Sequence, residues 1–181
     1  MMLRIVNSLL TLAVATLSVS AFAAEMNLSV NMSEAVAELK RKCQDHAEVS
    51  AKGDELVVIL KEVSGKGGFD GQFSIDLKKF SGRTFTFMVD VKSDKLSRDY
   101  RKIPPILGKV YFNAASRYIH SSHTEWNTLT FKGLKVPGNG LVKLRIELKN
   151  FNGEVSLRNP RIKGDISQTD YDKKKKKKDK K

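Results

Sequence analysis

Apolar and polar residues alternate along much of this chain. The apolar side of the clearest alternation, between residues 73 and 91, consists of Phe73, Ile75, Leu77, Phe85, Phe87, Val89 and Val91. A period of two predicts β-strands with one buried face, because successive side chains of a strand point to opposite sides of the sheet. Ser81-Gly82 divides the stretch and predicts a turn between two strands.

The same kind of pattern extends to both sides of this stretch. The sequence "AEVSAKGDELVVILKEV" predicts a strand, a turn at Lys52-Gly53-Asp54 and a second strand. The unbroken apolar run from Leu56 to Leu60 indicates that this second strand is buried on both faces. Val110 and Phe112 alternate with Tyr111 and Asn113 in the next predicted strand.

Two strands are predicted near the end of the chain. In "LVKLRIELKN" the inward positions are Val142, Leu144, Ile146 and Leu148. Asn152-Gly153 is the dipeptide that a type I′ hairpin requires, so "EVSLRNPRI" is expected to return as the last strand.

A helical spacing occurs only near the start of the mature chain. Val36, Leu39 and Cys43 follow Ser33, which can cap a short helix, although an extended segment also fits this stretch. Eight or nine short strands with so little helix exclude a βαβ arrangement. The pattern predicts an all-β protein, an antiparallel β-sandwich of the jelly-roll type with a short N-terminal helix.

The ends of the chain differ in composition from its middle. Residues 1–23 have a basic start, an apolar core and an Ala21-Phe22-Ala23 cleavage signal, and they predict a signal peptide for a secreted protein, periplasmic or extracellular. Residues 24–167 are expected to form one domain. Cys43 is the only cysteine, so its thiol is either buried and unreactive or joined by a disulfide to another molecule.

The net charge of +13 is unevenly distributed, because the last thirteen residues carry +5 of it. The last thirteen residues, "TDYDKKKKKKDKK", contain eight lysines and three aspartates. Residues 168–181 are therefore expected to be a disordered lysine-rich tail. Its partners would be anionic polymers of the cell envelope, in preference to nucleic acid, because the protein is exported.

Candidate chemistry gathers in the stretch "YIHSSHTEWNTLTF". His120 and His123 can share a metal ion only if Ser121-Ser122 forms a turn, and Glu125 is the one nearby acid. We therefore expect no metal and no other cofactor.

Trp126 is out of phase with the inward residues Leu129 and Phe131. Three interpretations are open: a bulge returns its ring to the core, the ring covers a sheet edge, or the ring meets a ligand.

Sugar binding needs an aromatic ring beside polar partners. Two sets of residues offer this combination. The first set, which we consider the better candidate, comprises Tyr111, Asn113, Tyr118 and His120. The second lies in a basic loop and comprises Arg98, Tyr100 and Arg101.

Several phrases of the sequence occur together: "FSIDLKKFSGRTFTFMVDVKSD", "EWNTLTFKGLKVP", "LVKLRIELKN" and "NGEVSLRNPRI". In this combination the chain resembles the carbohydrate-binding modules of the galactose-binding-domain-like superfamily, over about residues 55 to 162. The resemblance implies a jelly roll and a structural role for Trp126. Arg158-Asn159-Pro160 stands where such modules usually place acidic residues, which leaves a calcium site of the family's kind without its usual ligands.

The sequence has none of the common catalytic motifs, such as G-x-S-x-G or H-E-x-x-H. Asp70 and Asp76 form a carboxylate pair of the kind that glycosidic chemistry uses, but nothing in the sequence separates their pKa values, and we do not expect an enzyme. The leading interpretation is a secreted, non-catalytic carbohydrate-binding module. The alternative is an envelope-associated interaction protein that uses the jelly roll as a scaffold without a sugar site.

Overall fold

The computed structural model describes residues 25–41, 46–61, 68–96, 103–149 and 151–164. Several predicted features lie outside the described residues: the leader, Cys43, Arg98, Tyr100, Arg101 and the lysine-rich tail. The described chain forms ten strands, one α-helix and one short 3-10 helix, η1 (Lys78–Phe80). No helix in these ranges has the length and apolar character needed to span a bilayer.

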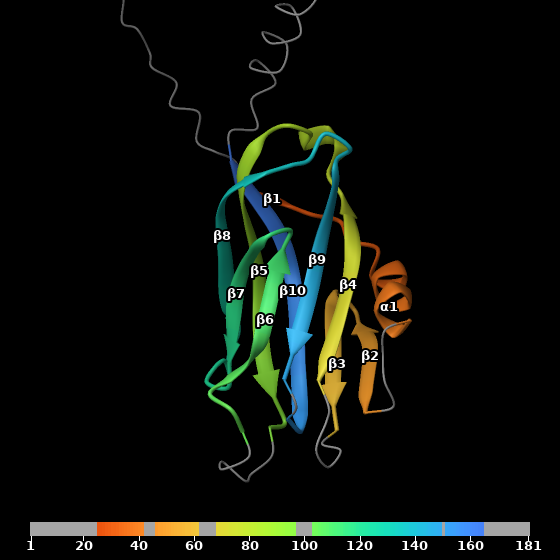
Figure 1. Ribbon diagram of the computed structural model, residues 1–181, viewed down its shortest axis with the longest axis vertical. Coiled ribbons are helices and arrows are strands. Elements are labelled where there is room, and N and C mark those ends of the chain that lie inside the picture. Colours follow the sequence, from red (N-terminus) through yellow and green to blue (C-terminus); the bar gives the residue numbers. More distant parts are fainter. Residues whose placement is uncertain (1–24, 42–45, 62–67, 97–102, 150, 165–181) are drawn as a thin grey trace, which may run out of the picture.

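The strands form two antiparallel sheets that pack face to face, as the sequence predicts (Figure 1). The six-stranded sheet contains β1 (Glu25–Asn27), β2 (Ala47–Lys52), β3 (Glu55–Leu60), β5 (Thr84–Asp94), β8 (Asn127–Lys135) and β10 (Gly153–Gly164). Its order is β2-β3-β10-β5-β8, and β1 pairs with the second half of β10.

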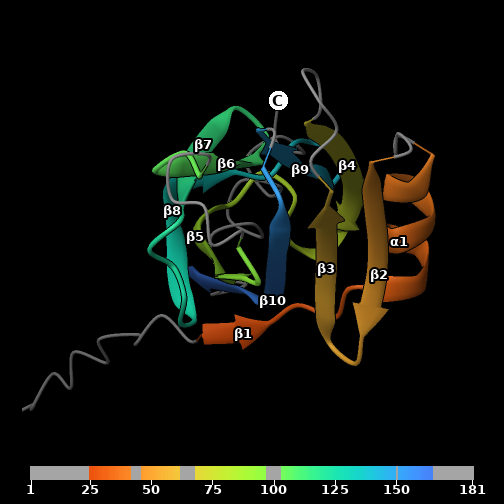
Figure 2. The same ribbon diagram turned by 90° about the horizontal axis from the view of Figure 1, so that it is seen from below.

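The four-stranded sheet lies in front of the six-stranded sheet in the view of Figure 1. It contains β4 (Phe69–Asp76), β6 (Ile106–Phe112), β7 (Ala115–His120) and β9 (Leu141–Leu148). Its order is β4-β9-β6-β7. Figure 2, which looks along the sandwich, shows the helix beside β2 at one side of the two layers.

An aromatic cluster joins the two sheets. Phe87 of β5 has its ring centroid 4.1 Å from that of Phe112 on β6 and 5.8 Å from that of Phe131 on β8. All three rings are fully buried, and each such burial stabilises the fold by about 1.5–3 kcal/mol. The alternation that predicted these strands therefore places the expected residues in the core.

Strand β3 is buried on both faces, as its continuous apolar run predicts. Val58 lies beside Val155 of β10, on the side that faces the other sheet. Val57 points to the opposite side, and its exposed fraction is nevertheless 0%. The turn before β3 also forms as predicted, with Gly53 at φ 64°.

The helix α1 (Met32–Lys40) begins before the predicted cap. Asn31 caps it, because the Asn31 side chain accepts a hydrogen bond from the backbone N–H of Glu34 at 3.3 Å; Ser33 lies inside the helix, so the predicted serine cap is wrong. Leu39 buries its side chain against the sandwich. Glu38 accepts a hydrogen bond from the backbone N–H of Ser74 at 3.2 Å, so the helix satisfies a donor on the edge strand β4.

The predicted hairpin at Asn152-Gly153 does not form. Strand β9 belongs to the four-stranded sheet and β10 to the six-stranded sheet, so the segment between them crosses from one sheet to the other. A dipeptide's turn preference is local, whereas the choice of sheet depends on where β10 can bury its side chains. A Cβ on Gly153 would lie 2.7 Å from the Leu96 side chain, so the glycine serves a close approach.

Gly108 of β6 lies in close contact with the backbone of β9. It pairs with Leu148, and a Cβ at this position would overlap the carbonyl oxygen of Glu147 and lie 2.9 Å from Cα of Leu148. Both of those atoms belong to the backbone, so the strands would have to separate to accept a side chain.

We expect Gly108→Ala to lower the free energy of unfolding by about 2 kcal/mol or more, because it overpacks a buried strand pair. Urea unfolding followed by circular dichroism measures this change. Gly138→Ala is the matched control, since a Cβ there meets nothing within 4 Å. Equal stability of the two variants would contradict the close β6–β9 approach.

Candidate functional site

Tyr111 and Tyr118 lie on the outer face of the four-stranded sheet. Tyr118 of β7 pairs with Lys109 of β6, and Tyr111 lies two residues beyond Lys109 on the same side. Their neighbours Val110 and Ile119 are buried between the sheets. The two tyrosines are diagonal cross-strand neighbours, a relation that places Cβ atoms about 7–8 Å apart.

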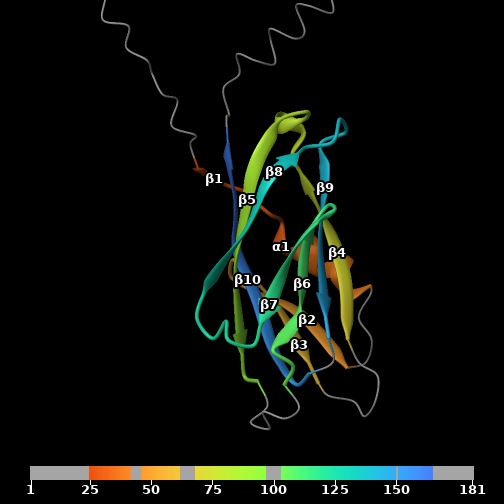
Figure 3. The same ribbon diagram turned by 60° about the vertical axis from the view of Figure 1, so that its left-hand side comes forward.

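Side chains from the adjacent strands complete this face. Glu147 of β9 pairs with Lys109, and Asp70 of β4 pairs with Glu147, while Arg145 of β9 pairs with Tyr111. We call this surface the aromatic platform, and define it as Tyr111, Tyr118, His120, Lys109, Asp70, Arg145 and Glu147. Figure 3 shows the four strands that carry it, β4, β9, β6 and β7, as one layer.

Arg145 is the fixed centre of the aromatic platform. Its Nε and Nη2 atoms each donate to a different oxygen of Asp70 at 2.6 Å, and Nη2 also donates to Glu147 at 3.3 Å. The hydrogen bonds to Asp70 raise the pKa of Arg145 above its ordinary value. A two-point contact of this kind holds the guanidinium in one orientation.

Tyr111 is held in place by the same network. The Arg145 guanidinium carbon lies 5.0 Å from the centroid of the Tyr111 ring, and the tyrosine hydroxyl donates to Glu147 at 2.9 Å. The hydrogen bond to Glu147, together with burial, raises the pKa of the Tyr111 phenol above 10.0. Its ring and its hydroxyl are both engaged within the protein.

Tyr118, by contrast, has a ring that a ligand can reach. Its exposed fraction is 48%, and it and Leu141 are the exposed large hydrophobic residues of the described chain. Lys109 Nζ lies 5.1 Å from its ring centroid. A contact of this kind at an exposed site is worth about 0.5–1 kcal/mol, so a ligand can displace the ammonium group.

His120, the last residue of β7, and His123, in the loop that follows, come close together. Residues 121–122 form the turn that a shared site would need, and the ring centroids of His120 and His123 lie 5.3 Å apart. Burial, and then the nearby His120, lower the pKa of His123 below 6.5. Among the described residues, no group of three or more His, Cys, Asp or Glu side chains could hold a metal ion.

The alternation predicted that Asn113 lies on the outward side of a strand, and this prediction is wrong. Asn113 occupies the turn between β6 and β7 with φ 52°, and its side-chain oxygen accepts a hydrogen bond from the backbone N–H of Lys143 at 3.2 Å. The amide therefore stabilises the end of the hairpin. Asparagine tolerates a positive φ better than most residues, which accounts for its place in the turn.

Trp126 lies on the other sheet, away from the two tyrosines. It precedes β8 on the outer side shared with Thr128, as its phase predicted, and no bulge returns it to the core. The Arg158 guanidinium carbon lies 3.9 Å from the centroid of its ring, and Arg158 pairs with Glu55 at 3.4 Å. The tryptophan thus covers an arginine and cannot act jointly with the aromatic platform.

The carboxylates Asp70 and Asp76 do not form a catalytic pair. They lie at opposite ends of β4, six residues apart, which corresponds to about 20 Å along a strand. Glycosidic acid–base pairs need a separation of about 5–9.5 Å. Asp70 contacts Arg145 and Asp76 contacts Lys78, so each has a structural partner.

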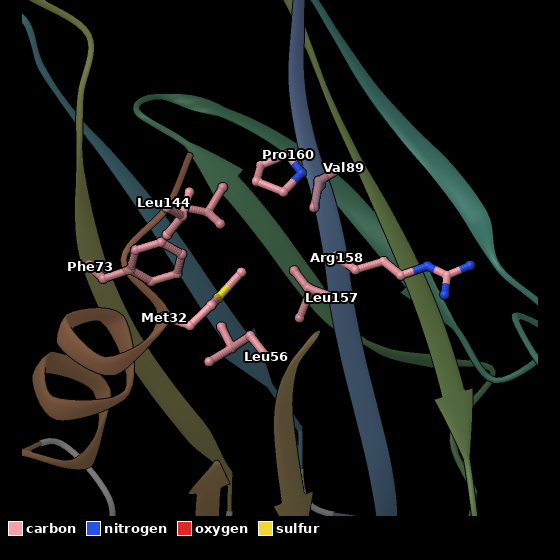
Figure 4. Close-up of a pocket in the computed structure, with 9 residues that line it drawn as sticks. Met32, Leu56, Phe73, Val89, Leu144, Leu157, Arg158 and Pro160 are labelled. Atoms are coloured by element: carbon pink, nitrogen blue, oxygen red, sulfur yellow. The ribbon is translucent and has the colours of Figure 1, made fainter. Parts of the chain in front are cut away.

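A small cavity lies between the sheets, beneath residues 30–32 (Figure 4). Apolar side chains line it, including Met32, Leu56, Phe73 and Leu144, and the guanidinium of Arg158 points away from it. Its volume of about 10 Å³ is close to the minimum for one water molecule. This cavity cannot hold a sugar, so we place the candidate site on the open surface of the aromatic platform.

Sequence reasoning did not find Lys109, Arg145, Glu147 or the role of Asp70 as members of the site. The alternation in "LVKLRIELKN" does place Lys143, Arg145 and Glu147 outward. It cannot reveal that β9 lies between β4 and β6, because strand order is not encoded in a local pattern.

Neither a family model nor a curated protein matches the sequence. In structure the chain is similar to solved carbohydrate-binding modules. A family 29 module from Piromyces equi has 12% identity, with 65% of this chain and 75% of that chain covered and a TM-score of 0.40. The family 11 module of a cellulosomal cellulase of Clostridium thermocellum has 14% identity, coverages of 67% and 84%, and a TM-score of 0.41.

The chain is also similar to the enzymatically active domain of a bacteriophage CBA120 tailspike protein. The identity is 15%, with 75% of this chain and 21% of that chain covered, and the TM-score is 0.48. At these TM-scores the comparisons transfer no residue roles to this chain.

The Tyr111–Glu147 contact predicts a shift in an alkaline titration. Its stabilising effect is present below pH 10.0, the unperturbed pKa of the phenol, and is lost as the pH rises through the raised pKa of Tyr111. Glu147→Gln should move the Tyr111 titration to lower pH. The tyrosinate absorbance, taken as the difference from the Tyr111→Phe variant, measures this; Glu125→Gln should leave it unchanged, and an unmoved titration in Glu147→Gln would contradict the contact.

The Trp126–Arg158 contact predicts a change in fluorescence, since Trp126 is the only tryptophan. Arg158→Ala uncovers one face of the indole, so its emission should shift to longer wavelength and acrylamide should quench it more strongly. Lys132→Ala is the control, because Lys132 is an exposed cation on β8, the strand that follows Trp126. Identical emission from both variants, with intact folding by circular dichroism, would show that the ring is not covered by Arg158.

Proposed function

We propose that this chain is a secreted, non-catalytic carbohydrate-binding module that binds a poly- or oligosaccharide on the aromatic platform. The observation that carries the proposal is the exposed ring of Tyr118 beside charged and hydrogen-bonding groups on three adjacent strands. A sugar presents an apolar face of C–H groups with hydroxyls around its rim, and this combination of ring and polar neighbours is complementary to it.

The residues of the aromatic platform take different roles in this proposal. Tyr118 stacks against the sugar. Lys109 and His120 flank Tyr118. The Lys109 ammonium donates hydrogen bonds to sugar hydroxyls, and the His120 imidazole donates or accepts them. Arg145 and Tyr111 act as positioning residues, because their mutual contacts fix Glu147 at the centre of the surface.

The open shape of the aromatic platform favours a chain-like ligand. A small molecule usually binds in a concavity that buries most of its surface, whereas the platform is the face of a sheet. A polysaccharide can lie across several strands and gain its affinity from repeated weak contacts. The lysine-rich tail would add a salt-sensitive attraction to anionic polymers of the cell envelope.

The alternative function is an envelope-associated interaction protein that uses the sandwich as a scaffold. One observation favours it: Arg145, Tyr111, Asp70 and Glu147 already satisfy one another without a ligand. In that case the outer face of the four-stranded sheet would be an ordinary paired surface, and attachment would depend on charge.

Affinity electrophoresis against neutral and acidic polysaccharides separates the two functions. We expect a neutral glycan to retard the mature chain at high salt, also when the chain is stopped after Ser167. Tyr118→Ala should weaken this binding about tenfold or more, which corresponds to about 1.4 kcal/mol. Tyr111→Phe keeps the ring and should weaken it less.

Leu141→Ala is the matched control, because Leu141 is exposed to the same degree as Tyr118 and lies on the same sheet. It should bind the neutral glycan like the unaltered chain. Retention on acidic polymers alone, which disappears when the tail is removed, would support the scaffold function and contradict a sugar site.

A further inference from the structure

Within the described residues, the excess of positive over negative charge lies at one end of the sandwich. This end consists of residues 25–27, 74–86, 131–143 and 161–164, which carry eight Lys or Arg residues and two carboxylates. The rest of the described chain carries eleven of each. The whole excess of positive charge in the described residues therefore lies at this end, the upper end in Figures 1 and 3.

Strand pairing brings these segments together. Lys135 pairs with Thr84 at the start of β5, and Lys163 pairs with Thr86. The helix η1, with Lys79, packs beside the start of β9, since the backbone N–H of Leu77 donates to the carbonyl of Gly140 at 2.8 Å. Lys78 of this region pairs with Asp76. We call the other five lysines the cationic end: Lys79, Lys132, Lys135, Lys143 and Lys163.

The lysines of the cationic end are not neutralised within the described part of the protein. None of the five forms an ion pair with a described carboxylate. The two acids of the region are already engaged, Asp76 with Lys78 and Glu25 with Arg161. Five unpaired cations on one rim create a field that attracts a polyanion.

We propose that the cationic end is a second binding surface, separate from the aromatic platform, for an acidic polysaccharide. Its lysines point in different directions: Lys135 and Lys163 project from the outer face of the six-stranded sheet and Lys143 from that of the four-stranded sheet. A flat bilayer can contact only one of these faces at a time. A flexible polymer can follow the rim and contact both.

The position of the tail supports this assignment. Gly164, the last described residue, pairs with Phe85 at the cationic end. The six consecutive lysines begin at Lys173, nine residues further along the chain. The tail is therefore attached at the end that carries the excess positive charge of the described residues, so both can engage one polymer. The predicted export of the protein favours a glycan over nucleic acid as that polymer.

The test measures binding to polygalacturonate over a range of NaCl concentrations, with the mature chain and with a chain stopped after Ser167. The shortened chain should still bind at low salt. In either chain, Lys135→Gln/Lys163→Gln should reduce the slope of log affinity against log salt by about two, one for each lost contact.

The control Lys40→Gln/Lys149→Gln removes the same charge from exposed positions outside the cationic end and should leave the slope unchanged. Tyr118→Ala should also leave it unchanged, which separates this surface from the sugar site. Loss of all binding on tail removal, or equal effects of the two lysine pairs, would overturn the proposal. So would equal or tighter binding to phosphatidylglycerol vesicles or single-stranded DNA.

Discussion

The packing of Phe87, Phe112 and Phe131 between the two sheets is the contact on which the rest of the molecule depends. Each ring comes from a different strand, and together they fix which side of β5, β6 and β8 faces inward. Since side chains alternate along a strand, burying Phe112 directs Tyr111 outward, and burying Phe131 leaves Thr130 on the outer face. The surface that could bind a ligand is thus determined by the core beneath it.

The sequence predicts much of this arrangement because alternation and continuous apolar runs are local signals of burial. It placed Phe73, Phe85, Phe87 and Val89 inward, found the two-sided burial of β3, and put Trp126 on the opposite side from Leu129 and Phe131. It failed where the outcome depends on distant segments. The turn preference of Asn152-Gly153 is real, but β10 is needed between β3 and β5, so the chain crosses to the other sheet.

The sequence likewise predicts one part of the candidate site and misses another. The outward phase of Tyr111 and Tyr118 was readable from the sequence, whereas their partners were not, because Arg145 and Asp70 come from strands whose order in the sheet no local pattern reveals. The network also changes how the pair is interpreted. Tyr111 is engaged with Arg145 and Glu147, so Tyr118 remains as the ring that a sugar can cover.

The central claim is that a sugar stacks on Tyr118. The most direct measurement is a nuclear magnetic resonance titration of the mature protein with neutral oligosaccharides, with the aromatic ring signals assigned. The account predicts that the ring protons of Tyr118 shift most, that those of Tyr111 and His120 shift less, and that the indole of Trp126 is unaffected. Shifts confined to Trp126, or no shift in the tyrosine rings at saturating sugar, would contradict it.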